Sequence, residues 1–379
     1  MNNDIVNSKI SSTGVTTELK LALKNIHLPA FKPDHIISLT DDTGIIQHAT
    51  GNIPNRKEGY CLDDNSRALI LAILGWEQNQ DENLQKLIPL YLSFIHYMQR
   101  EDGKFINFLD YSRNYSEKVG SEDAYGRTLM ALGYILTSSQ SSLVIKTADV
   151  IFQNAFIHIH TLTSIRGIAN SIIGLCKYVR YNYTDNNKKS AIIKLSDILT
   201  EEYHKNTSPG WYWYESILSY DNAILPLSLL YAYDITHNSI YLKVALDSIK
   251  FLESIVFRNG TLETVGNNGW YPQNGVPALF DQQPIDTMAM ILLYQKVYEL
   301  TNDQRFMLNM TISYEWFIGR NTTGIPLYDC HTGGCSDGLQ IDGINYNQGA
   351  ESTISFWISY FTVIDTFNKN RIKVKELSI

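Results

Sequence analysis

Apolar residues occur along the chain in two alternating kinds of segment. Segments of the first kind begin with polar or acidic residues and continue with apolar residues on nearly every face, which is typical of helices buried all round. Segments of the second kind repeat apolar residues at i, i+3, i+4 and i+7, with charged residues opposite, as in helices that face solvent on one side. Helices of the buried kind are predicted within 63–73, 121–135, 164–178, 219–233, 283–298 and 349–361.

The second kind of segment lies between the members of the first. Such an alternation, at a spacing of roughly 40 to 65 residues, is an internal repeat, and repeats bury their apolar faces by stacking on their neighbours. Six inner and six outer helices therefore predict a closed ring, and the absence of linkers predicts a single domain over 1–379, with an N-terminal tail of about residues 1–16. The outer helices are expected within 83–99, 143–160, 188–205, 240–256, 304–319 and, at the start of the chain, 17–30.

Residues with strand propensity gather in 102–112 and 261–275, which we interpret as short hairpins or loops on the rim of the ring. The net charge of −8, with no basic stripe, argues against a nucleic-acid partner. The 24 Tyr and 6 Trp supply flat amphipathic rings that suit sugar ligands, although an aromatic-rich helical core is the alternative.

The chain contains no apolar run long enough for a membrane span. Its polar N-terminus does not read as a secretory signal, and its four Cys form no disulfide framework. We therefore expect a cytoplasmic protein, while a signal peptide that has been removed would leave the same sequence.

The six helix pairs resemble the (α/α)6 toroid of glycoside hydrolases, polysaccharide lyases and sugar epimerases, over about residues 17–367. In particular, TDDTGIIQHATGNIPNRKEGYCLDDNSRALIL and YNQGAEST resemble a bacterial helical domain found alone or fused to glycosyltransferases in carbohydrate-processing loci. The resemblance implies an all-α toroid with short rim hairpins or loops, an oligosaccharide or glycoside substrate, and a functional association with a glycosyltransferase.

Acidic residues stand at the starts of the buried segments. In a toroid the inner helices run in one direction, so the resemblance implies that these starts meet at one funnel. Carboxylates gathered in one pocket raise one another's pKa, which suits hydrolysis by a protonated carboxyl and a second carboxylate that activates water. N-capping is the alternative for any single acid. The catalytic candidates are Glu351, Asp286, Asp64 and Asp123.

Further residues near the same starts are candidates for substrate binding. Arg67 and Arg127 follow the acids by about one helical turn, and structural salt bridges are the alternative role for both. Aromatic and amide groups next to the later helices suit stacking on sugar rings and binding of hydroxyl groups. The remaining candidates are Asp63, Glu122, Trp213, Glu215, Asp221, Asn222, Trp270, Tyr271, His331, Gln348 and His48.

Cys330, His331 and Cys335, with the distant Cys61, offer soft ligands for zinc, and lanthionine-forming cyclases use an adjacent Cys-His pair in a helical toroid. The spacing does not match standard zinc motifs. We therefore expect no metal and no cofactor.

The sequence favours a glycoside hydrolase that inverts, since most toroid hydrolases invert. An epimerase is one alternative, but epimerases of this fold usually place His on the inner helices, and these segments contain none. A lyase that acts on uronates is a further alternative, but it would need a basic subsite, and the candidate residues here are mainly acidic. A glycan-binding or glycosyltransferase-associated domain without catalysis is the third alternative.

Overall fold

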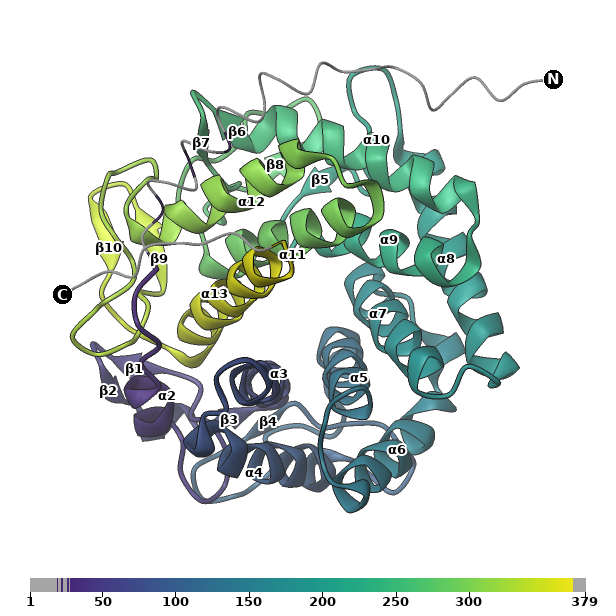
Figure 1. Cartoon of the computed structure of the whole chain (residues 1–379), viewed down its shortest axis with the longest axis vertical. Coiled ribbons are helices and arrows are strands. Elements are labelled where there is room, and N and C mark those ends of the chain that lie inside the picture. The colour runs from purple at the N-terminus through teal and green to yellow at the C-terminus, as the bar shows by residue number, and fades with distance from the viewer. Residues whose placement is uncertain (1–18, 20–21, 23–25, 27, 371–379) are drawn as a thin grey trace.

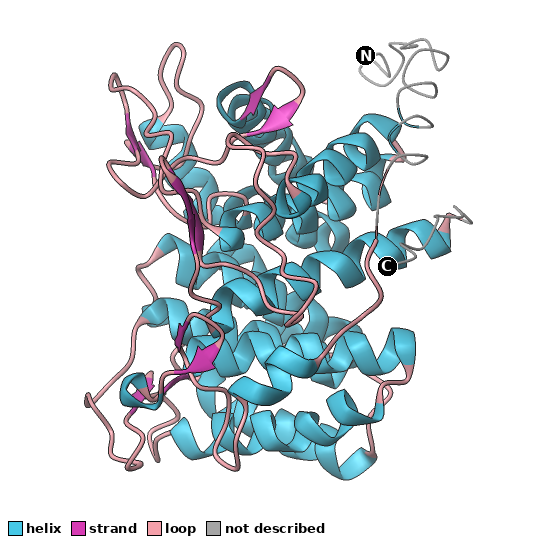
Figure 2. Ribbon diagram, turned by 90° about the vertical axis from the view of Figure 1, so that its left-hand side faces the viewer, coloured by secondary structure: helices cyan, strands magenta, loops and turns pink. Residues whose placement is uncertain are grey.

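The computed structural model describes residues 19, 22, 26 and 28–370, and these residues form two concentric layers of helices. Figure 1 shows the ring face-on, with one layer of helices around the centre and a second layer outside it. Figure 2 shows the same molecule from the side, where strands and long loops gather on one face. The fold class predicted from the sequence is confirmed.

The inner layer consists of six helices that are buried on most sides, as their sequences, apolar on nearly every face, predict. Each inner helix packs against the next, and the last packs against the first, so the ring closes. These helices are α3 (Leu62–Asn79), α5 (Glu122–Leu136), α7 (Ile165–Tyr181), α9 (Ile224–Thr236), α11 (Pro284–Thr301) and α13 (Ala350–Lys369).

The outer layer is amphipathic, and each of its helices covers the inner helix that precedes it in the chain. The outer helix expected at 17–30 lies mostly outside the described residues. A short helix, α2 (Asp34–Leu39), packs against α13. The outer helices are α4 (Glu82–Met98), α6 (Ser142–Phe156), α8 (Asn186–Asn206), α10 (Ser239–Val256) and α12 (Gln304–Glu315).

All strands within the described part of the chain are two or three residues long and pair antiparallel, as rim hairpins and crossings between loops. They pair β1 (Ala49–Thr50) with β2 (Ile53–Pro54), β3 (Tyr60–Cys61) with β4 (Phe108–Leu109), β5 (Ile217–Leu218) with β8 (Tyr271–Pro272), β6 (Phe257–Arg258) with β7 (Thr261–Leu262), and β9 (Gly338–Gln340) with β10 (Gly343–Asn345). Three 3-10 turns, η1 (Arg56–Glu58), η2 (Ile159–Thr161) and η3 (Trp316–Ile318), complete the connections.

Side-chain N-caps are present on all five described outer helices but on only three of the six inner helices. Each outer helix has a side chain that accepts a hydrogen bond from a first-turn N–H, given in chain order by Asp81, Ser141, Asp185, Asn238 and Asp303. On the inner helices α3, α5 and α7 this role falls to Cys61, Ser121 and Ser164, and α9, α11 and α13 have no side-chain cap. The acids in the first turns of the inner helices are therefore not N-caps.

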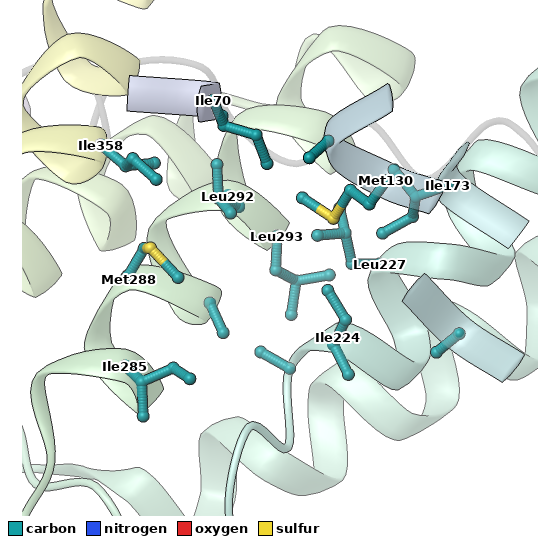
Figure 3. Close-up of a cluster of buried hydrophobic side chains, with 14 of the residues drawn as sticks. Ile70, Met130, Ile173, Ile224, Leu227, Ile285, Met288, Leu292, Leu293 and Ile358 are labelled. Carbon is teal, nitrogen blue, oxygen red and sulfur yellow. The ribbon is translucent and has the colours of Figure 1, made fainter. Parts of the chain in front are cut away.

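The axis of the ring is filled with apolar side chains from all six inner helices (Figure 3). On α3, Asp64, Arg67 and Ile70 follow one another at intervals of three residues, which places them on similar faces at increasing depth. A charged layer at the helix starts thus lies above an apolar floor. The floor includes Ile70, Met130, Ile173, Ile224, Met288 and Ile358.

Helices α5 and α7 approach each other closely through four glycines. A Cβ on Gly126 would lie 2.3 Å from the carbonyl oxygen of Gly167, and a Cβ on Gly174 would lie 2.5 Å from that of Leu129. Gly133 faces Gly174 in the same way. We call this contact the glycine seam; it leaves no room for side chains between the two helices.

Candidate active site

Two arginines tie together the starts of several inner helices. Arg67 contacts Asp64 of its own helix and Glu351 of α13, with a distance of 3.0 Å between nitrogen and oxygen in each pair. Arg127 of α5 contacts Asp63 of α3 and Asp221 ahead of α9, again at 3.0 Å each. Four of the acids, Asp63, Asp64, Asp221 and Glu351, are therefore joined through two arginines.

A third arginine, Arg166 of α7, belongs to the same layer although the sequence analysis did not name it. It pairs with Glu215 at 2.9 Å, donates to Ser219 Oγ at 2.8 Å and lies over the Tyr220 ring. Its signal in the sequence was the same as that of Arg67 and Arg127, an arginine in the first turns of a buried helix.

The two acids at the start of α5 hold the entrance of α7. Glu122 accepts hydrogen bonds from the backbone N–H groups of Thr163 and Ser164, at 2.6 Å and 2.5 Å. Asp123 accepts from the hydroxyl groups of Ser164 and Tyr220. Both carboxylates lie beside the glycine seam.

An open cavity of about 430 Å³ lies to one side of the ring, above the starts of α3, α11 and α13. Five of the predicted residues line it, namely Asp63, Asp64, Arg67, Glu351 and His48. The other lining residues are Gln47, Cys61, Phe108, Asn267, Asp281, Gln283, Pro284, Asp337, Asn345, Gly349 and Ser352. The side chain of Glu351 is 44% exposed, whereas that of Asp64 is 4% exposed.

Two carboxylates of the cavity, Asp281 and Asp337, were not predicted. Asp281 comes shortly before the start of α11, and its side chain has no hydrogen-bond or ion-pair partner among the described residues. Asp337 accepts hydrogen bonds from Gly349 N, at 2.8 Å, and from the Ser352 hydroxyl group. Burial raises the pKa of Asp337. Both residues lie in irregular loops, where no periodic pattern marks a side chain as facing the cavity.

The adjacent acids Asp63 and Asp64 have opposite pKa shifts. Burial raises the pKa of Asp64 to about 6; Arg67 opposes this increase and the Glu351 carboxylate adds to it. Burial also acts to raise the pKa of Asp63, but Arg127 and then Arg67 outweigh it and hold that pKa below its ordinary value. Asp63 is therefore ionised at neutral pH, whereas Asp64 titrates in mildly acidic solution.

Each oxygen of the Asp64 carboxyl group has its own donor. Arg67 donates to Oδ1 at 3.0 Å, and the Cys61 thiol donates to Oδ2 at 3.0 Å. The same sulfur accepts the Asp64 backbone N–H at 3.4 Å, which makes Cys61 the N-cap of α3.

Asp286 lies next to the cavity but is not part of its lining. It is 6% exposed, and its Oδ1 atom has no hydrogen-bond partner among the described residues. Burial, and then the charge of Asp221, raises the pKa of Asp286 to about 8. Arg127 and Asp221 border a smaller, mainly apolar hollow below the cavity, which includes Ile70 and Met130 of the floor.

The remaining predicted residues do not line the cavity. Trp213 is fully buried against Tyr214 and Phe251, and Asn222 hydrogen-bonds the backbone of Ser219. Trp270 lies near the Tyr220 ring, and Tyr271 packs against Trp211. Gln348 hydrogen-bonds Asp329 and Thr332, and Lys32 binds the backbone oxygen of the exposed His331.

Within the residues that the structure describes, no group of three or more His, Cys, Asp or Glu side chains could hold a metal ion. Of the cysteines considered as zinc ligands, Cys61 and Cys335 are buried and Cys330 is exposed. The described helices also include none that is both long enough and apolar enough to cross a membrane.

Neither the known family profiles nor the curated proteins include a match to the sequence. Solved structures do match. A sugar epimerase from a ruminal bacterium superposes with a TM-score of 0.71 at 11% identity, over 94% of this chain and 99% of that one. The GH76 alpha-mannanase from Bacteroides thetaiotaomicron gives a TM-score of 0.63 at 12% identity, over 96% and 99%. The fold is the (α/α)6 toroid.

A third similar toroid is an inactive variant of the alpha-1,6-mannanase GH76A from Salegentibacter sp. HEL1_6, in complex with alpha-1,6-mannotetrose. Its TM-score is 0.58 at 15% identity, and the match covers 93% of this chain and 98% of that one. Two adjacent aspartates of that enzyme are replaced by alanine. At such identities the likeness establishes the toroid fold and leaves the reaction to be argued from the site.

Proposed function

We propose that the protein is a carbohydrate-active enzyme that hydrolyses glycosidic bonds. The observation that carries this proposal is the pair of carboxylates held by Arg67 in one cavity: a buried Asp64, whose pKa is raised to about 6, and a half-exposed Glu351. Hydrolysis of a glycosidic bond needs one carboxyl group that can donate a proton and one carboxylate that can accept one.

In the proposed reaction Asp64 is the general acid and Glu351 the general base. The Asp64 carboxyl group donates its proton to the glycosidic oxygen as the bond between that oxygen and the anomeric carbon breaks. Glu351, the more exposed of the two, takes a proton from a water molecule that attacks the anomeric carbon from the opposite face, which inverts its configuration. Asp123 and Asp286, the other sequence candidates, have no role in this step.

The adjacent acids at the start of α3 support this choice of site. Asp63 and Asp64 are two neighbouring aspartates at a cavity, and the mannanase from Salegentibacter is described as inactive when two adjacent aspartates are replaced. Environments that push the pKa values of two carboxyl groups apart are typical of acid–base assignments in enzymes.

The charge of the cavity argues against a lyase that acts on uronates. Five carboxylates line it, and its one guanidinium, that of Arg67, is already paired with two of them. An anionic sugar would meet repulsion there. An epimerase is disfavoured because none of the six inner helices carries a His, and His48 is the only His in the cavity lining.

The test is to incubate the purified protein with oligosaccharides tagged at the reducing end, both neutral and uronate-containing, and to separate the products. We expect cleavage of a neutral glycan, and an inverted anomer as the first product in proton NMR. Asp342→Asn, at the exposed tip of the β9–β10 hairpin and outside the cavity, is the control for unspecific effects. Binding without cleavage of any glycan would favour a glycan-binding domain, and interconversion of sugars without cleavage an epimerase.

We also propose that the enzyme works in association with a glycosyltransferase. This proposal rests on the likeness of the two quoted sequence segments to a domain found fused to such enzymes. Co-purification of the intact chain with a glycosyltransferase encoded beside it would support the association, and the absence of any complex would contradict it.

A further inference from the structure

The thiol of Cys61 has a place in the cavity that its role as an N-cap does not require. Ser, Thr, Asp and Asn are the usual N-cap residues, and the outer helices use them. At α3, however, a thiol both accepts the Asp64 N–H, at 3.4 Å, and donates to Asp64 Oδ2, at 3.0 Å. One sulfur atom therefore contacts both the backbone and the carboxyl group of the proposed acid.

The position of this sulfur is fixed by its surroundings. Cys61 pairs with Phe108 across the β3–β4 ladder, and its carbonyl oxygen accepts the Asn65 side chain at 2.9 Å. The residue is buried, yet it contributes to the cavity lining next to Asp64. The thiol thus has little freedom to turn away from the carboxyl group.

A thiol differs from a hydroxyl group in being a weak donor and a weak acceptor. A donor to the ionised form of a carboxyl group favours that form. Because a thiol is a weaker donor than an O–H group, it stabilises the ionised carboxylate less. When Asp64 is protonated, the sulfur lone pairs remain available to its O–H group. A weak partner of this kind suits a carboxyl group that must hold a proton and then release it.

We propose that Cys61 is a positioning residue for the hydrolysis: it holds the Asp64 carboxyl group at the cavity and tolerates both its protonated and its ionised form. This inference rests on the proposed function. The other charged or titratable groups with the largest effect on Asp64 are Asp63 and Arg67 on α3 and Glu351 on α13, and the same cavity is lined by His48, Asp281 and Asp337 from its loops. They stay unchanged when Cys61 is replaced, so a change in the titration of Asp64 reports on the thiol.

The experiment measures the titration of Asp64 and the pH dependence of kcat in two variants. Cys61→Ala removes a donor to the ionised form, so the pKa of Asp64 should rise and the alkaline limb of the rate profile should move up by about half a pH unit. Cys61→Ser supplies a stronger donor, so both should move down by a similar amount. Well above the pKa, half a pH unit corresponds to about a three-fold change in rate.

Shifts in opposite directions distinguish this role from simple damage to the cap, which would lower stability in Cys61→Ala without moving the profile of Cys61→Ser. Cys176→Ala is the matched control, because it removes a buried thiol on α7 that has no contact with Asp64. Carbon-13 NMR of the Asp64 carboxyl group gives the titration without any substrate. Equal titrations in wild type and both variants would overturn the inference and leave the hydrolase proposal intact. Opposed NMR shifts without any hydrolysis would overturn the proposed function, and with it the role of Cys61 in hydrolysis, while the effect of the thiol on Asp64 would stand.

Discussion

Three carboxyl groups of the charged layer, those of Asp63, Asp64 and Asp286, have different pKa shifts because burial and neighbouring charges act on each in different proportion. Asp63 is ionised because Arg127 and Arg67 outweigh its burial, while Asp64 is more buried and shares Arg67 with Glu351. Asp286 is paired with no arginine, and its burial beside Asp221 raises its pKa further. Acids close together at one end of the ring can therefore have different chemical roles.

Asp64→Asn tests the proposed acid. Asparagine keeps the shape of the side chain, and the cap of α3 is Cys61, so the melting temperature should hardly change. Removal of the proton donor should lower kcat by about 100-fold or more, and Glu351→Gln should cost at least as much. In the wild type, kcat should fall above a pH of about 6, as Asp64 loses its proton.

These values come from steady-state kinetics across pH, with thermal melts of each variant as the control for folding. Full activity in a double variant, Asp64→Asn with Glu351→Gln, would remove both residues from the mechanism.

Asp286→Asn tests the cost of the buried acid. The folded-state pKa of Asp286 lies above the ordinary value. Between about pH 4 and pH 8 the folded protein therefore keeps a proton on Asp286 that the unfolded chain has already lost. Stability therefore falls as the pH rises through this window, and asparagine removes that loss. The variant should be more stable than wild type, by roughly 3 to 4 kcal/mol more at pH 8 than at pH 5, since three pH units separate the two conditions at about 1.4 kcal/mol per unit.

Urea unfolding at the two pH values measures this difference. An equal effect at pH 5 and pH 8 would mean that Asp286 titrates normally. Retained hydrolysis in the same variant would exclude Asp286 as a catalytic group.

At the scale of elements, the outer helices begin with residues that stabilise the helix, whereas inner helices such as α3 and α13 begin with the acids of the proposed site. In each described outer helix an Asp, Asn or Ser side chain at the N-cap accepts a hydrogen bond from a first-turn N–H group. Inner helices place their acids one to three residues further along. There Asp63, Asp64 and Glu351 bind arginines, whereas Glu122 and Asp123 accept hydrogen bonds from residues next to the start of α7 and from Tyr220. The glycine seam is a steric constraint between two inner helices, since a Cβ on any of its four glycines would lie 2.3–2.8 Å from a backbone atom of the other helix.

Gly174→Ala tests the seam. In an open helix, alanine would stabilise the protein by up to about 1 kcal/mol because of its helix propensity. Here its Cβ would meet backbone atoms of Leu129 at 2.5 Å and 2.6 Å, so we expect a loss of about 1 to 3 kcal/mol. Chemical unfolding of this variant beside Lys146→Ala, on the exposed face of α6, measures the effect, and a gain in stability from Gly174→Ala would contradict the close contact.

At the scale of the whole molecule, the repeat of buried and amphipathic segments was enough to predict the ring. Periodicity encodes helices and their buried faces, and the acidic starts encode where the site lies. The periodic pattern did not reveal all the acids that face the cavity, because Asp281 and Asp337 lie in loops whose paths are set by tertiary contacts. The same limit applied to Trp213, whose ring is buried against its neighbour Tyr214 and against Phe251 of α10.

A closed ring in which every inner helix contacts two others should unfold as a unit. We therefore expect one calorimetric transition, with equal calorimetric and van't Hoff enthalpies, as for a single domain. Two separated transitions, or a stable fragment after limited proteolysis, would indicate two folding units and contradict the single domain predicted from the sequence.

The cavity is lined by residues from early and late parts of the chain, since α3 is the first inner helix in the sequence and α11 and α13 are the last two. During synthesis on the ribosome, Asp64 is made almost 300 residues before Glu351, its partner on Arg67. Helices α2 to α12 can thus be translated before the proposed catalytic pair exists. A polypeptide released before α13 would lack the proposed base and would leave the ring open between α11 and α3, so we expect it to be inactive.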